Sequence, residues 1–165
     1  MKLNKLQKKI GISFKDDKLL IQALTHKSFD TKNNYEKLEF LGDRVLGFVI
    51  SKKLLELYPN EKVGMIDKKL ANLVNKNKCF EIGKELELDN YILTGNTEKK
   101  KKVNIEKKII SDCCESLIGA IYIDKGFEVS SKFILNYWKN YLNLSDITVI
   151  DSKTRLQEYS LKKFK

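Results

Sequence analysis

The stretch YEKLEFLGDRVL, residues 35–46, combines an apolar stripe with regularly spaced acids. Its apolar side chains recur at intervals of three and four residues, the spacing of one helix face: Leu38, Leu41, Val45 and Phe48. Pro59 must stop this helix, because the residue before a proline avoids helical backbone angles. We therefore predict a long helix that opens at residues 33–34 and ends at residue 57 or 58.

The rest of the chain also has the pattern of helices, because its 165 residues contain one proline and eight glycines. Apolar residues at helical spacing predict further helices: around 3–10, over 18–25, from 64–67 to 74, around 80–86, over about 105–124, and through 133–142. Turn residues and a charge run predict a loop over residues 89–103. We therefore expect an all-α fold of about seven helices, with Trp138 in the core or in an interface.

The length suits one domain, which we place at residues 1–144. Residues 145–165 read as a polar linker and the opening of a further, truncated domain. The longest apolar runs are far shorter than the roughly 20 residues of a membrane span. Three cysteines form no disulfide framework, and a lone histidine, His26, excludes a zinc knuckle and suggests a structural role. We expect a cytoplasmic protein without a membrane partner.

The charge is strongly positive, with 32 Lys and Arg against 22 Asp and Glu, a net +10. Such an excess favours a polyanionic partner, nucleic acid first. The alternative is a lysine-rich composition inherited from an AT-rich genome, since nearly all of the basic residues are lysines. Charge alone leaves both explanations open.

Two acidic stripes lie inside the apolar helices. Glu36, Glu39 and Asp43 share one helix face, and Asp112 and Glu115 share a face of a second helix. If the stripes meet, two carboxylates about 4 Å apart repel by roughly 4 kcal/mol at an effective dielectric constant near 20. A bound divalent cation offsets this repulsion, and carboxylate oxygens suit Mg²⁺ or Mn²⁺.

Gly42 and Gly119 stand beside these acids. A mid-helix glycine costs about 0.5–1 kcal/mol relative to alanine, so two of them suggest that the helix backbones cross closely there. The alternative is that each acid pairs on a solvated face with a neighbouring base: Lys37, Arg44 or Lys108. Spacing alone does not choose between a metal site and such pairs.

These residues also carry a resemblance. Residues 35–46 resemble the signature of the ribonuclease III family, the double-stranded-RNA endonucleases, and SDCCESLIGAIYID at 111–124 resembles the family's second acidic motif. ALTHKS at 23–28 resembles its N-terminal segment, and DSKTRLQEY at 151–159 resembles the join to a C-terminal RNA-binding domain. The motifs cover essentially the whole chain in the family's order.

The resemblance implies a homodimeric, all-α endonuclease that hydrolyses double-stranded RNA with Mg²⁺, for which Mn²⁺ is a possible substitute. It implies no small-molecule cofactor. The products would carry 5′-phosphate and 3′-hydroxyl ends with short 3′ overhangs. The expected substrates are ribosomal precursor RNA, messenger RNA and other structured RNA.

Carried over by motif, the resemblance assigns metal binding to four acids: Glu39, Asp43, Asp112 and Glu115. Asp43 and Glu115 would be the catalytic pair most directly needed for hydrolysis. Glu36 matches an acid at the rim of the active site. Phe40 matches the aromatic residue that such dimers insert into a pocket of the partner subunit.

Two departures from the family pattern stand out. Val63 precedes Gly64 where members usually carry a glutamate, which puts the reaction rate and RNA engagement in doubt. The RNA-binding domain begun near residue 151 is not completed, so we expect weak, salt-sensitive RNA binding. The alternative function is a non-catalytic member that binds RNA or a ribonucleoprotein. The retained acids favour the enzyme.

Overall fold

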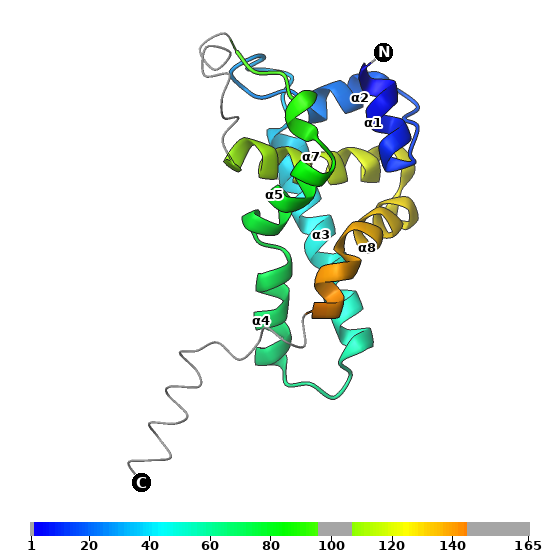
Figure 1. The fold of residues 1–165 in the computed structure, drawn as a ribbon, viewed down its shortest axis with the longest axis vertical. Coiled ribbons are helices and arrows are strands. Elements are labelled where there is room, and N and C mark those ends of the chain that lie inside the picture. Colours follow the sequence, from blue (N-terminus) through cyan, green and yellow to red (C-terminus); the bar gives the residue numbers. More distant parts are fainter. Residues whose placement is uncertain (1, 96–106, 145–165) are drawn as a thin grey trace, which may run out of the picture.

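The computed structural model describes residues 2–95 and 107–144. The expected linker and further domain at 145–165, and most of the expected loop, lie outside the described residues. Within the described ranges the chain forms seven α-helices and one 3₁₀ turn (Figure 1): α1 (Lys2–Ile10), α2 (Asp17–Ala23), α3 (Glu36–Leu57), α4 (Val63–Leu73), α5 (Lys76–Glu85), η1 (Leu88–Asn90), α7 (Lys107–Lys125) and α8 (Phe127–Leu144). The all-α prediction is confirmed.

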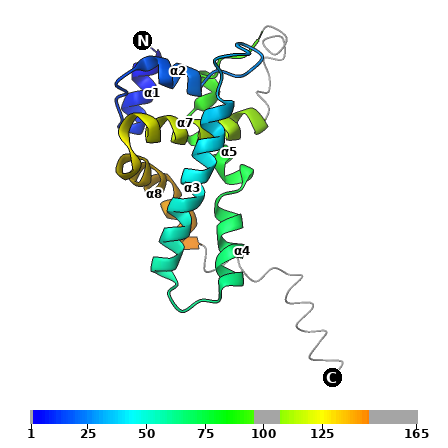
Figure 2. The same ribbon diagram turned by 180° about the vertical axis from the view of Figure 1, so that it is seen from behind.

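Helix α7 is the centre of the fold. It runs between α5 on one face and α3 on the other, as the two opposite views show (Figures 1 and 2). Every residue from 109 to 121 is buried, and apart from Asp112 and Glu115 this segment carries small or apolar residues all around the helix. Trp138 of α8 is also fully buried, and its Nε1 donates to the carbonyl of Leu73 at 2.8 Å. Its predicted core position is confirmed.

The helix ends follow local chemistry. The side chain of Asp16 accepts a hydrogen bond from the backbone N–H of Lys18 and caps α2. The side chain of Asn34 accepts a hydrogen bond from the N–H of Glu36, the first residue of α3. Helix α3 ends at Leu57, two residues before Pro59. None of the helices in the described ranges is long and apolar enough to cross a membrane.

Helix α8 begins earlier than its apolar pattern predicts. Gly126 adopts a left-handed conformation with φ of +82° and turns the chain directly from α7 into α8. The start of the loop predicted over residues 89–103 is held by backbone hydrogen bonds. Leu93 exchanges backbone hydrogen bonds with Leu24 and His26, at 2.8 and 2.9 Å.

Helices α3 and α7 cross at two glycines, as the sequence suggests. A Cβ at Gly42 would overlap the backbone carbonyl of Glu115, and a Cβ at Gly119 would overlap that of Leu38. Each helix backbone therefore rests directly on the other. Because the acids flank these glycines, the crossing brings the two acidic stripes to the same place.

Candidate metal centre

Three carboxylates from two helices form one cluster at the crossing. Oxygen atoms of Glu39, Asp112 and Glu115 all lie within 4.8 Å of one another. Glu39 on α3 is half-buried, whereas Asp112 and Glu115 on α7 are only 4% and 2% exposed. The acidic stripes therefore meet in a place shielded from water, where their mutual repulsion needs a cation to offset it.

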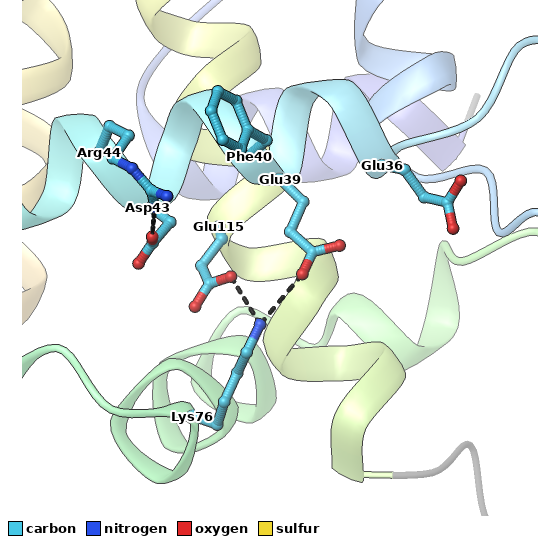
Figure 3. Close-up of a pocket in the computed structure, with 7 residues that line it drawn as sticks. All are labelled: Glu36, Glu39, Phe40, Asp43, Arg44, Lys76 and Glu115. Carbon is cyan, nitrogen blue, oxygen red and sulfur yellow. Dashed lines mark hydrogen bonds and ion pairs between the residues drawn. The ribbon is translucent and has the colours of Figure 1, made fainter.

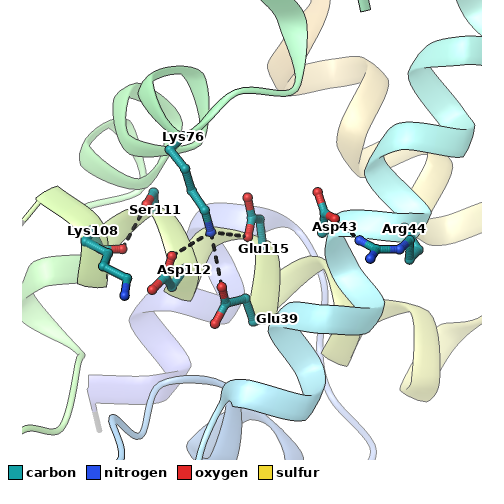
Figure 4. A network of polar contacts seen from close by, with 8 residues as sticks. All are labelled: Glu39, Asp43, Arg44, Lys76, Lys108, Ser111, Asp112 and Glu115. Carbon is teal, nitrogen blue, oxygen red and sulfur yellow. Dashed lines mark hydrogen bonds and ion pairs between the residues drawn. The ribbon is translucent and has the colours of Figure 1, made fainter. Parts of the chain in front are cut away.

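The ammonium group of Lys76 supplies a positive charge at the centre of this cluster. Its Nζ lies 2.6 Å from Asp112 Oδ1, 2.8 Å from Glu115 Oε2 and 3.1 Å from Glu39 Oε1. Figure 3 shows the contacts with Glu39 and Glu115, and Figure 4 shows all three. Lys76 is the first residue of α5, and Asn75 caps this helix by accepting from the N–H of Lys78. The cap fixes the backbone from which the lysine reaches the acids.

Sequence reasoning missed Lys76. Its partners are more than 35 positions away along the chain, so no local spacing connects them. The only local signal is Asn75, which marks the start of a helix but says nothing about where its first side chain points.

The electrostatics of the cluster favour a bound cation. Burial raises the pKa values of Glu39 and Glu115 above their ordinary range, and the hydrogen bonds from Lys76 oppose this rise. Burial lowers the pKa of Lys76, but its hydrogen bonds to Asp112 and Glu115 outweigh burial and raise the pKa overall. The ammonium is therefore charged at neutral pH. These effects show that the acids stabilise a cation at their centre.

The donor set fits a hard divalent metal. Three carboxylate oxygens converge on one point, and that point already holds a positive charge in the form of the ammonium group. Mg²⁺ and Mn²⁺ prefer such oxygen ligands, with water completing the coordination. Glu39, Asp112 and Glu115 are therefore the residues that could hold a metal ion.

Asp43 lies one turn beyond Glu39 on α3 and lines an open pocket together with Glu39 and Glu115, but its carboxylate is outside the cluster. It pairs instead with Arg44, its neighbour in the chain (Figure 4). For Asp43, the structure therefore shows pairing with a neighbouring base, the alternative to metal binding that the sequence left open. The other three acids pair with Lys76, which sequence reasoning did not consider.

An open pocket faces the cluster, and Figure 3 shows the residues that line it: Glu36, Glu39, Phe40, Asp43, Arg44, Lys76 and Glu115. Glu36 is away from the cluster and pairs with Lys27 at 3.1 Å. Phe40 is 65% exposed. The guanidinium carbon of Arg44 lies over its ring, 4.8 Å from the ring centroid.

The remaining candidates lie apart from the cluster. Val63 is the first residue of α4 and 75% exposed, and it is not among the residues that line the pocket. The carboxylate of Glu61 accepts from the backbone N–H of Lys62 at 3.1 Å. Nδ1 of His26 lies 2.8 Å from Ser28 Oγ and accepts from the Ser28 N–H, which fits the structural role expected for this histidine.

The chain is similar to known proteins over most of its length. The sequence model of the ribonuclease-III-like family matches residues 16–142. Ribonuclease 3 of Pelagibacter ubique is 61% identical over 167 aligned positions, which cover 100% of this chain and 75% of that protein. Ribonuclease 3 of Hahella chejuensis is 44% identical over 96% of this chain and 70% of its own length.

Solved structures of related proteins have a similar fold. The nuclease domain of ribonuclease III from Campylobacter jejuni has a TM-score of 0.79 at 37% identity, covering 83% of this chain and 96% of that one. That domain has structural flexibility in a region involved in dimer formation. Dicer from Pichia stipitis, with a TM-score of 0.64 at 19% identity, shares the fold alone. With its two acidic motifs meeting where α3 crosses α7, the chain belongs to the ribonuclease III family of endonucleases.

Proposed function

We propose that this protein is a homodimeric, Mg²⁺-dependent endoribonuclease that cleaves double-stranded RNA. The observation that carries this proposal is the cluster of three carboxylates around a single cation position, in a chain of net charge +10. A binding protein would gain nothing from burying mutually repelling acids, whereas metal-assisted phosphodiester hydrolysis requires them.

In this proposal, Glu39, Asp112 and Glu115 hold the metal, and Asp43 joins them when its carboxylate leaves Arg44. When bound, Mg²⁺ or a substituting Mn²⁺ activates water and stabilises negative charge on the phosphate. By the resemblance to the family's motifs, Asp43 and Glu115 are the acids most directly needed, and both line the open pocket. Glu36 contributes at the rim of that pocket.

The RNA would be recognised by shape rather than by sequence. A-form duplexes expose their phosphates and 2′-hydroxyls but hide most base edges, and the excess of lysines suits contacts with phosphates. We propose ribosomal precursor RNA, messenger RNA and other structured RNA in the cytoplasm as substrates. The nuclease domain would occupy residues 1–144, and residues 145–165 would form a linker and the start of an RNA-binding domain.

Phe40 supports the homodimer. Its exposed ring stands beside the pocket and would insert into the partner subunit. Two copies of the site in one dimer would cut both strands and leave 5′-phosphate and 3′-hydroxyl ends with short 3′ overhangs. Val63, where the family usually has a glutamate, would reduce the rate without changing the reaction.

The second candidate is a non-catalytic member that binds RNA or a ribonucleoprotein. One observation favours it specifically: Lys76 already neutralises part of the acidic cluster, so the buried acids have a partner without any metal. If that pairing were permanent, the fold would be retained and the cleavage lost.

Cleavage of a long RNA duplex at low salt separates the two candidates. The protein, an Asp43→Asn variant and a Glu128→Gln variant would be incubated with Mg²⁺ or with EDTA. Glu128 is an exposed acid on α8 and controls for the loss of one negative charge. The proposal predicts short duplex products with the protein and with Glu128→Gln, only when Mg²⁺ is present. Intact but gel-shifted RNA in every reaction would support the binding protein instead.

A further inference from the structure

Lys76 has a place in the metal site that the proposed reaction does not explain. Its Nζ contacts all three carboxylates of the cluster at 2.6–3.1 Å, two of which are almost completely buried. A metal ion bound to the same three oxygens, at the roughly 2.1 Å typical of Mg²⁺, would need the position that this nitrogen occupies. The ammonium group and the metal therefore compete for one place.

The carbon chain of Lys76 is partly exposed to solvent. Lys76 starts α5 at the mouth of the open pocket, and its side chain is 51% exposed. Because half of the lysine side chain already faces solvent, it can leave the cluster without displacing core residues. Asp112 and Glu115, in contrast, lie in the buried segment of the central helix α7. Two of the three acids are thus buried in the core, whereas half of the lysine side chain faces solvent.

We infer that Lys76 is a resident counter-ion, which stabilises the metal-free site and which a divalent metal must displace in order to bind. This inference rests on the proposed function, since it concerns the same metal site. Lys76 is accordingly a positioning residue. It sets the metal concentration at which the site fills and keeps the acids together when no metal is present.

The test is direct binding of Mn²⁺, measured by calorimetry without RNA, so that cleavage plays no part. Lys76→Gln removes the charge but keeps most of the length of the side chain. Lys78→Gln is the matched control: it removes a lysine two positions along α5 that pairs with Glu81 at 2.8 Å, outside the cluster. Lys76→Arg keeps a positive charge at the site.

We expect Lys76→Gln to bind Mn²⁺ at least about tenfold more tightly than the unaltered protein, because a hydrogen-bonded charge no longer has to be displaced. Lys78→Gln should change the affinity less than twofold, and Lys76→Arg should bind no more tightly than the unaltered protein. Without metal, Lys76→Gln should melt at a lower temperature than Lys78→Gln, and Mn²⁺ should raise its melting temperature more. If Lys76→Gln is unfolded without metal, its refolding on addition of Mn²⁺ is the expected result.

Unchanged Mn²⁺ affinity in a folded Lys76→Gln variant would overturn the inference and leave the proposed function intact. So would a Lys76→Gln variant that stays unfolded in Mn²⁺ while Lys76→Arg binds more tightly than the unaltered protein. No Mn²⁺ binding by either the unaltered protein or Lys76→Gln would overturn both, because the site would then not be a metal site.

Discussion

Replacing Gly42 by alanine tests the close crossing of α3 and α7 on which the site depends. A Cβ at this position overlaps the backbone carbonyl of Glu115 and lies 2.8 Å from the nitrogen of Gly119. Carbon and neighbouring heavy atoms prefer separations of about 3.5 Å or more, so the helices must move apart by roughly 1.5–2 Å. Neither obstacle is a side chain that could rotate away.

The expected cost follows from this geometry. Overpacking a core typically costs 1–3 kcal/mol, and rigid backbone on both sides of Gly42 puts this substitution at about 3 kcal/mol. For a chain of this length, that loss lowers the melting temperature by roughly 6–12 °C. Glu115 would move with its backbone, so Mn²⁺ affinity should fall as well.

Gly47 provides the matched control, because it lies on the same helix and a Cβ there meets nothing within 4 Å. Gly47→Ala should gain about 0.5–1 kcal/mol from helix propensity alone. Both variants would be unfolded in urea at equal protein concentration, with circular dichroism as the readout. A Gly42→Ala variant within about 0.5 kcal/mol of Gly47→Ala would refute the close crossing.

Three further predictions concern residues outside the crossing. Burial alone would raise the pKa of Asp124, but the N–H of Lys15, 3.1 Å away, holds it below the ordinary value. Asp124→Ala should therefore cost about 1.5–3 kcal/mol in urea unfolding at pH 7, and the difference should shrink as pH falls below about 3.9; a constant difference at pH 2.5 would contradict this. Phe40→Ala should shift the protein from dimer to monomer in sedimentation without lowering its helicity, whereas an unchanged dimer would refute the role of the ring. Val63→Glu should raise the rate of RNA cleavage, and an unchanged rate would show that the missing acid is irrelevant.

The helices and their crossing could be predicted from sequence, because both depend on local spacing. Apolar residues at intervals of three and four locate α3 and α7, and glycines beside acids, at Gly42 and Gly119, mark where the two backbones touch. The start of α8 was less predictable. Its first turn alternates the apolar Phe127 and Val129 with polar residues, and the helix begins directly after the left-handed Gly126.

The arrangement of charges inside the site could not be predicted in the same way. Lys76 reaches Asp112 across 36 positions of the chain, a contact that exists only after α5 packs against α7. Asp43 shares a helix face with Glu39 but turns its carboxylate to Arg44, and such a choice of rotamer leaves no trace in the spacing. Sequence patterns thus predicted that the two acidic stripes meet, but not that Asp43 stays outside the cluster or that Lys76 enters it.

The most direct measurement is a crystal structure of the protein with bound Mn²⁺, using anomalous scattering to locate the metal. The account predicts a peak bonded to carboxylate oxygens of Glu39, Asp112 and Glu115, with the ammonium group of Lys76 moved out of the cluster. No peak at these three acids in crystals saturated with Mn²⁺, with Lys76 still in place, would contradict the account.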